Sequence, residues 1–203
     1  KVLAPLAGLP VLGHIVSRLR RSKYNLKIIL ATSVNEEEVE LVGYAQSIGV
    51  EVVRGPEQNV LERYRLIRER YDFDYLVSIC GDSPLVEASC VDFLLDEIIE
   101  SGADYAKLKP DSICIHEGID PISQRGLDKL LDEAADDPIA QEHVNGYFQT
   151  QPEFCRACEV SFPLAEQFEV RLSVDTPADL EFLEALYAQS GCAAGELAVT
   201  DIP

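Results

Sequence analysis

Two kinds of apolar pattern alternate along the first half of the chain. Residues Leu12, Ile15, Val16 and Leu19 recur at helical spacing, whereas runs such as KIILAT (27–32) are short and β-branched, as strands are. We expect the 27–32 strand to be buried on both faces. The pattern predicts helices over 11–21, 35–49, 59–71 and 88–101, and strands over 27–32, 50–53, 75–80 and 104–108.

The second half of the chain is less regular, although it ends in a clear helix. Thr176 is a typical N-cap for a helix over 176–191, Pro177 takes its first position, Asp179 lies three residues after the cap and Gly191 ends it. Before it we expect a short strand within 112–122, helices over 126–135 and 138–148, and strands over 154–160 and 170–174.

Alternating helices and strands with short connections predict an α/β fold. We expect a mainly parallel, Rossmann-like sheet with helices on both faces. The predicted organisation is a single domain over 1–190 with a subsidiary excursion around 110–160, followed by a weakly patterned tail over 191–203. In such sheets ligands bind at the carboxyl ends of the strands.

Composition narrows the class of function. A formal charge of −19 argues against nucleic acid as a partner, because phosphate backbones require a basic surface. We find no apolar run of membrane-spanning length and no signal peptide, so the chain is expected to be cytoplasmic. It begins with Lys and contains no Met, so we expect its natural N-terminus to lie upstream.

The six cysteines indicate a reduced environment, since most lie in apolar runs. Cys155 and Cys158 form a C-x-x-C pair, but no second pair of zinc ligands is evident. Ordinary strand residues are therefore favoured over a zinc or redox site.

Two aspartates each follow an apolar strand directly: Asp82 in SICGDSP and Asp175 in LSVDTP. If the two strands end side by side, the carboxylates face one another and repel unless a cation lies between them. Carboxylate oxygens with room for water and phosphate suit Mg²⁺. In the alternative interpretation, Asp82 caps the turn before Pro84 and Asp175 merely precedes the next helix.

The N-terminal segment KVLAPLAGLPVLGHI places Lys1 before a Pro/Gly loop and a helix, which is a weak phosphate-binding signal. Together with RGPEQNVLERY (54–64), GDSPLV (81–86), EHVNGYF (142–148) and RLSVDTPADL (171–180), it resembles the sugar cytidylyltransferases, and most closely the spore-coat polysaccharide (SpsF) and acylneuraminate cytidylyltransferase-like group. The resemblance extends in order over nearly the whole chain.

This resemblance implies a nucleotide-diphospho-sugar transferase-like fold and an enzyme that joins CTP to a sugar with release of pyrophosphate, for surface polysaccharide synthesis. It implies Mg²⁺ held by Asp82 and Asp175, with Lys1 neutralising phosphate as the third catalytic residue. The implied nucleotide-binding residues are Lys1, Ala31, Thr32, Arg54, Gly81 and Asp82. The implied sugar-binding residues are Asp120, Glu142, His143 and Arg171, with Gly118 beside them.

Departures from the family leave alternatives open. The family's first strand and phosphate loop should precede Lys1, so we expect the chain as given to be poorly active. Ile122 stands where relatives usually carry an acid, so the sugar, with an acidic nonulosonate-type sugar as one candidate, is not identified. A glycosyltransferase of related fold and a non-catalytic nucleotide-binding relative remain the rival functions. A homodimer through the 110–160 excursion is expected from the resemblance.

Overall fold

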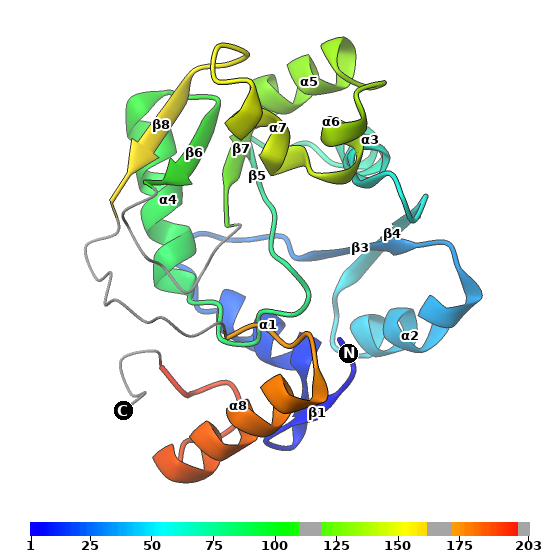
Figure 1. Cartoon of the computed structure of the whole chain (residues 1–203), viewed down its shortest axis with the longest axis vertical. Helices are drawn as coiled ribbons and strands as arrows, with labels where there is room; N and C mark the ends of the chain where they lie inside the picture. The colour runs from blue at the N-terminus through cyan, green and yellow to red at the C-terminus, as the bar shows by residue number, and fades with distance from the viewer. Residues whose placement is uncertain (110–118, 162–171, 199–203) are drawn as a thin grey trace.

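The computed structural model describes residues 1–109, 119–161 and 172–198 of the chain. Figure 1 shows strands at the centre with helices packed around them. Through residue 109 the predicted alternation is confirmed, with boundaries shifted by a few residues. The elements there are β1 (Pro5–Leu6), β2 (Leu9–Pro10), α1 (Val11–Leu19), β3 (Ile29–Ser33), the 3-10 turn η1 (Glu36–Glu38), α2 (Val39–Ser47), β4 (Glu51–Gly55), α3 (Val60–Arg70), β5 (Tyr75–Val77), α4 (Ala88–Ser101) and β6 (Tyr105–Leu108).

The later elements follow the prediction less closely. The expected helix over 138–148 is broken at His143, whose φ of −128° and ψ of 76° leave the helical region. Residues 172–174 form no strand, and the rest of the expected 170–174 strand lies outside the described residues, as does most of 112–122. The elements are β7 (Pro121–Ser123), α5 (Gln124–Glu133), α6 (Pro138–Glu142), α7 (Val144–Thr150), β8 (Ala157–Val160) and α8 (Pro177–Ser190).

Helix ends show where local sequence signals succeed. Thr176 and Asp179 form a reciprocal capping box at α8, and Gly191 ends that helix with a left-handed φ of 67°. The predicted cap at Asn35 is wrong, because its side chain makes no capping bond and donates instead to Glu57. The chain enters α2 through the 3-10 turn η1 instead.

The strands form mixed ladders, so the expectation of a mainly parallel sheet is not borne out as stated. In the described residues, β3 and β4 pair in parallel as one two-stranded sheet. A four-stranded sheet has the order β5-β7-β6-β8, in which β7 runs antiparallel to both β5 and β6 while β6 and β8 are parallel. The short β1 and β2 make an antiparallel hairpin at the N-terminus.

Helices cover both faces of the four-stranded sheet, as predicted. Tyr105 of β6 packs into one core with residues of α3, α5, α6 and α7, while the next residue, Ala106, packs into another with residues of α1, α4 and α8. Successive strand residues point to opposite faces, so these two cores lie on opposite sides of the sheet. Cys158 lies on β8 as predicted, whereas Cys155 precedes that strand, and their side chains belong to different cores.

A third core joins β3 and β4 to α1 and α2. The side chains of β3 are only partly buried over Ile29–Ala31 and become buried at Thr32 and Ser33, so the expectation of a strand buried on both faces is wrong. Within the described ranges, no helix combines the length and apolar content needed to cross a membrane.

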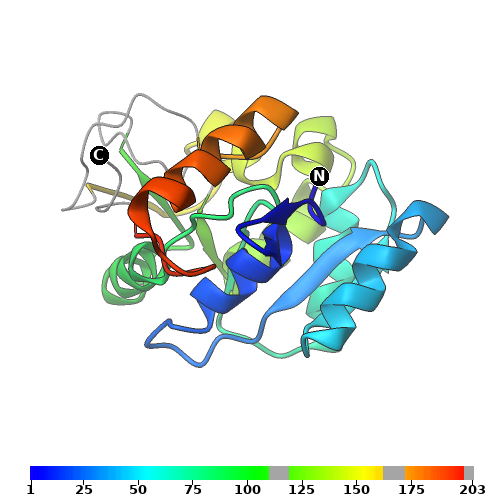
Figure 2. The same cartoon turned by 90° about the horizontal axis from the view of Figure 1, so that it is seen from below.

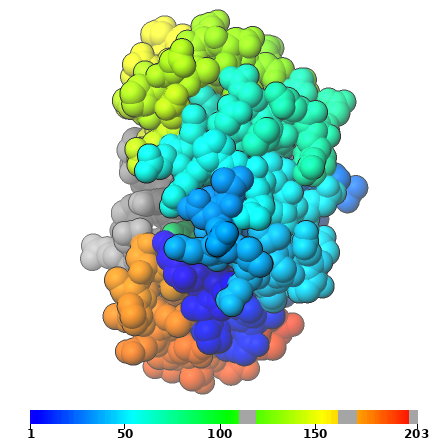
Figure 3. All heavy atoms as spheres, turned by 90° about the vertical axis from the view of Figure 1, so that its right-hand side faces the viewer, coloured from blue at the N-terminus to red at the C-terminus, as the bar shows by residue number. Residues whose placement is uncertain are grey.

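The C-terminal helix returns to the N-terminal hairpin. Figure 2 shows α8 beside α1 and the hairpin, and Figure 3 shows the first residues of the chain against those of α8. The tail after α8 is also fastened: Leu197 is 1% exposed, and its carbonyl accepts a hydrogen bond from Arg18 at 2.7 Å. Leu197, in a part of the chain with a weak sequence pattern, is therefore packed in the core.

Candidate active site

Lys1 is placed by the hydrogen bonds of the first turn. The Lys1 carbonyl accepts from the Ala4 amide at 2.9 Å, and the Val2 carbonyl accepts from the Leu12 amide at 3.0 Å. These bonds fix the start of the chain against the first turn of α1. The Lys1 side chain consequently projects from a held backbone while its own atoms stay largely exposed.

Asp82 follows the end of β5 in a tight turn. The strand stops at Val77, earlier than predicted, and Ser83 donates its amide to the Cys80 carbonyl at 3.3 Å. The segment around Asp175 comes alongside, because the Val174 amide donates to the Asp82 carbonyl at 2.8 Å. This one backbone bond sets the two aspartates side by side although 93 positions separate them in sequence.

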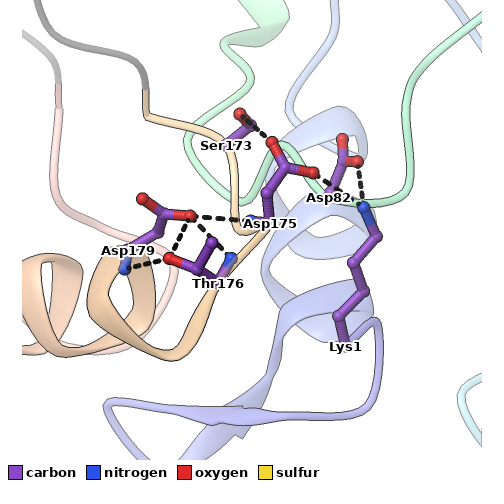
Figure 4. Close-up of polar contacts among 6 residues, drawn as sticks. All are labelled: Lys1, Asp82, Ser173, Asp175, Thr176 and Asp179. Carbon is purple, nitrogen blue, oxygen red and sulfur yellow. Dashed lines mark hydrogen bonds and ion pairs between the residues drawn. The ribbon is translucent and has the colours of Figure 1, made fainter.

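The Lys1 ammonium lies between the two carboxylates (Figure 4). Its Nζ is 2.7 Å from Asp82 Oδ2 and 3.0 Å from Asp175 Oδ1. Hydrogen bonding to Asp82, and next to Asp175, raises the pKa of Lys1 above its ordinary value, so the ammonium stays charged. The expected repulsion between the carboxylates is thus relieved by a cation that the sequence pattern did not place there.

The same arrangement fits a divalent cation. Two carboxylate oxygens from different segments converge on one cationic position, which Lys1 Nζ takes in this structure. The side chains of Asp82 and Asp175 are 23% and 39% exposed, which leaves room for water and phosphate oxygens. Among the described residues no group of three or more His, Cys, Asp or Glu could hold a metal. Mg²⁺ typically uses one or two carboxylates plus substrate phosphates, so a two-carboxylate site suits it.

The other predicted nucleotide-binding residues lie mostly on β3 and β4. Thr32 pairs with Arg54 in the parallel register, and Ala31 precedes Thr32 on β3. The Thr32 hydroxyl donates to Glu38 at 2.9 Å, and the Arg54 guanidinium donates to the Ser33 and Asn35 carbonyls. In the part of the chain that the structure describes, no hydrogen bond joins them to the Asp82–Asp175 pair. Gly81 lies next to the pair and is exposed.

Arg54 also borders a cavity of about 620 Å³ between β4 and α3. The cavity is lined by Val52, Val53, Arg54, Leu66, Glu69 and Arg70. The Arg54 guanidinium already donates hydrogen bonds to two backbone carbonyls. A role for Arg54 in nucleotide binding stays a prediction.

The predicted sugar-binding residues fall in different environments. Asp120 is 5% exposed, its carboxylate accepts from the Tyr105 hydroxyl at 2.5 Å, and burial raises its pKa above the ordinary value. Glu142 and His143 are exposed at the junction of α6 and α7, with His143 Nε2 3.7 Å from Glu142 Oε1. Their roles stay predictions, while Arg171 and Gly118 lie outside the described residues.

Two residues beside the pair were not singled out as functional from sequence. Ser173 donates its hydroxyl to Asp175 Oδ2 at 3.3 Å. Asp179 accepts the amide hydrogen of Asp175 at 3.0 Å, in addition to its capping bond from Thr176. The spacing T-P-x-D revealed the cap, but only the fold shows that Asp179 also contacts the backbone of Asp175.

Comparisons with known proteins identify the family of this chain. A family model for cytidylyltransferases matches residues 1–199, and the chain therefore belongs to the cytidylyltransferase family. It is 30% identical over 200 residues to the spore coat polysaccharide biosynthesis protein SpsF of Bacillus subtilis, covering 94% of this chain and 81% of that protein.

Solved structures share the fold. A cytidylyltransferase from Leptospira borgpetersenii superposes with a TM-score of 0.86 at 23% identity, covering all of this chain and 84% of the other. A CMP:2-keto-3-deoxy-manno-octonic acid synthetase complexed with CTP superposes with a TM-score of 0.69 at 18% identity, covering 93% of this chain and 92% of the other. The resemblance to sugar cytidylyltransferases noted in the sequence is confirmed by these relatives.

Proposed function

We propose that this chain joins the cytidylyl group of CTP to a sugar, forming a CMP-sugar and releasing pyrophosphate. Membership of the cytidylyltransferase family supports use of CTP. The observation that carries the proposal is the convergence of Asp82 and Asp175 on one cationic position. The name of the SpsF relative supports a role in surface polysaccharide synthesis.

The chemistry needs charge control more than a side-chain nucleophile. A sugar hydroxyl oxygen attacks the α-phosphorus, the bond from that phosphorus to the oxygen bridging to the β-phosphate breaks, and the hydroxyl proton passes to solvent. Negative charge grows on the phosphate oxygens, so fixed cations lower the barrier. A divalent cation held by Asp82 and Asp175 would supply that charge stabilisation.

Lys1 has two roles in this proposal. Without the metal, its ammonium neutralises the paired carboxylates. When the carboxylates hold the divalent cation instead, the flexible and 45% exposed Lys1 side chain is free to neutralise phosphate charge. The exposure of all three side chains supports such an exchange of partners, because exposed ion pairs contribute little stability and separate at low cost.

A pyrophosphate-release assay tests the proposal. The full chain is incubated with CTP, Mg²⁺ and a panel of free neutral, amino and acidic sugars, and isothermal titration compares CTP with UTP, ATP and GTP. We expect CTP binding to exceed that of the others and slow pyrophosphate release with at least one sugar, since this chain is expected to be poorly active. Purine preference would contradict the assignment. CTP binding without turnover on any sugar would favour a non-catalytic relative, and cleavage of a nucleotide-sugar without pyrophosphate would favour a glycosyltransferase.

The predicted homodimer and cytoplasmic location also belong to this proposal. Light scattering at high micromolar concentration tests the first, since a monomer there would contradict it.

A further inference from the structure

One oxygen of Asp179 gathers three hydrogen bonds at the start of α8. Asp179 Oδ2 accepts from the Asp175 amide at 3.0 Å, from the Thr176 amide at 2.7 Å and from the Thr176 hydroxyl at 2.9 Å (Figure 4). In a capping box the Asp179 side chain needs to accept only from the N-cap amide, which is that of Thr176, while the Thr176 hydroxyl accepts from the Asp179 amide. The bond to the Asp175 amide is additional, and it holds the backbone of a residue in the carboxylate pair.

We propose that Asp179 is a positioning residue that fixes Asp175 so that its carboxylate points at the cation position shared with Asp82. This inference rests on the proposed function, in which that position takes a divalent cation. Asp179 does not touch the Lys1 ammonium in any described contact. It acts through the backbone of Asp175.

The surrounding contacts explain why such a residue is needed. The Asp175 side chain is 39% exposed, so packing alone does not hold it. The residue before it is fastened to the opposite segment, since Val174 donates its amide to the Asp82 carbonyl. Two successive amides are therefore held by different partners. The bond of the Val174 amide sets the separation of the two aspartates. The bond of the Asp175 amide to Asp179 sets the orientation of Asp175.

A purely helix-capping role makes a different prediction. Glu is the usual partner in a capping box, so Asp179→Glu retains the negative charge and the cap of α8. Its extra methylene moves the carboxylate oxygens away from the place where one of them meets the Asp175 amide. Asp179→Asn keeps the length and an accepting oxygen but removes the charge. If Asp179 only caps the helix, Asp179→Glu should leave cation binding unchanged. If Asp179 positions Asp175, Asp179→Glu should weaken cation binding more than Asp179→Asn does.

The experiment measures Mn²⁺ affinity of the full chain by the electron paramagnetic resonance signal of free Mn²⁺, together with urea unfolding. For Asp179→Glu we expect affinity to fall about 10-fold or more, as for other residues that orient metal ligands, with the urea unfolding midpoint unchanged. Asp179→Asn should lose less affinity. Asp137→Ala, which removes the N-cap of α6, should lower the urea unfolding midpoint without changing Mn²⁺ affinity.

The outcomes separate this inference from the proposed function. If Asp82→Asn and Asp175→Asn abolish Mn²⁺ binding while Asp179→Glu binds as the parent does, Asp179 only caps the helix and the inference is overturned. If neither Asp82→Asn nor Asp175→Asn changes Mn²⁺ binding, the metal site itself is wrong. If Asp179→Glu weakens Mn²⁺ binding only as much as Asp137→Ala does for the same loss of stability, positioning is also refuted.

Discussion

The C-terminal part of the chain is fastened to the N-terminal part at two places with opposite chemistry. At the candidate active site, the exposed ammonium of Lys1 bridges Asp82 and Asp175. Elsewhere, the buried guanidinium of Arg18 donates to backbone carbonyls of the tail and of the loop before α4. Exposed charges can exchange one partner for another, whereas a buried guanidinium leaves unsatisfied carbonyls when it is removed. We infer that the first place serves ligand binding and the second serves stability.

His14 completes the buried fastening. Its Nε2 lies 2.7 Å from the Leu6 carbonyl, while its Nδ1 lies 3.1 Å from the Gly195 amide and 3.0 Å from the Tyr187 hydroxyl. The carbonyl can only accept and the amide can only donate, so the ring is neutral with its proton on Nε2. One buried imidazole thereby joins the hairpin, α8 and the tail.

The largest expected effect is on turnover, from neutralising either carboxylate of the exposed pair. Asp82→Asn or Asp175→Asn should lower kcat/KM for CTP on the order of 10³-fold, because the cation position loses a ligand. Melting temperature should change little, since exposed ion pairs contribute little. Asp128→Asn, which weakens an exposed ion pair with Arg68, is the matched control and should turn over normally. Near-parental activity of either site variant would show that the exposed pair does not serve ligand binding.

The next largest effect is on the free energy of unfolding, and it comes from replacing the buried guanidinium of Arg18. Arg18→Met keeps much of the side-chain volume but removes the donors to Val86, Leu197 and their neighbours, so unfolding free energy should fall by about 2–4 kcal/mol. Urea unfolding measures this. Arg21→Met, an exposed change two residues after the end of α1, should cost less than about 0.5 kcal/mol. Equal losses in both variants would show that Arg18 is not a structural fastening.

A smaller effect concerns pH. Burial lowers the pKa of His14 below its ordinary value of 6.5. The unfolded chain therefore takes up a proton near pH 6.5 while the folded chain resists, so stability is fully present above that pH and falls as the pH drops below it. Unfolding of the parent at about pH 7.5 and about pH 5.5 should differ more than that of His14→Gln, which does not titrate. The same pH dependence in both proteins would exclude His14 as the cause.

The smallest effect is a gain. Ala7 has a φ of +48°, a left-handed conformation that costs a residue with a Cβ, and its amide donates to Glu184 of α8 at 2.8 Å. Ala7→Gly relieves that cost, and we expect about 0.5–1 kcal/mol of added stability in urea unfolding. The matched change Ala4→Gly lies at a residue without this conformation and should give no gain. A loss at Ala7 would show that the hairpin is held by other contacts.

Local signals in the sequence determined the positions of many helices and the family of this protein. Apolar periodicity located helices of the first half such as α1 and α3, since a helix that packs on a core must show an apolar stripe. Capping residues marked α8 because the N-cap interaction is complete within four residues. The motifs that run in order along the chain, including those around Asp82 and Asp175, together pointed to the family, which the family model confirms.

Only the tertiary structure decided what depends on distant segments. The reversal of β7 between β5 and β6, which makes the sheet mixed, arises from pairing rather than from any local pattern. The same holds for Leu197, whose carbonyl accepts from Arg18, and for Lys1, which neutralises two carboxylates 81 and 174 positions away. Sequence spacing specifies which side chains share a helix or strand, but contacts between elements depend on how the whole core packs.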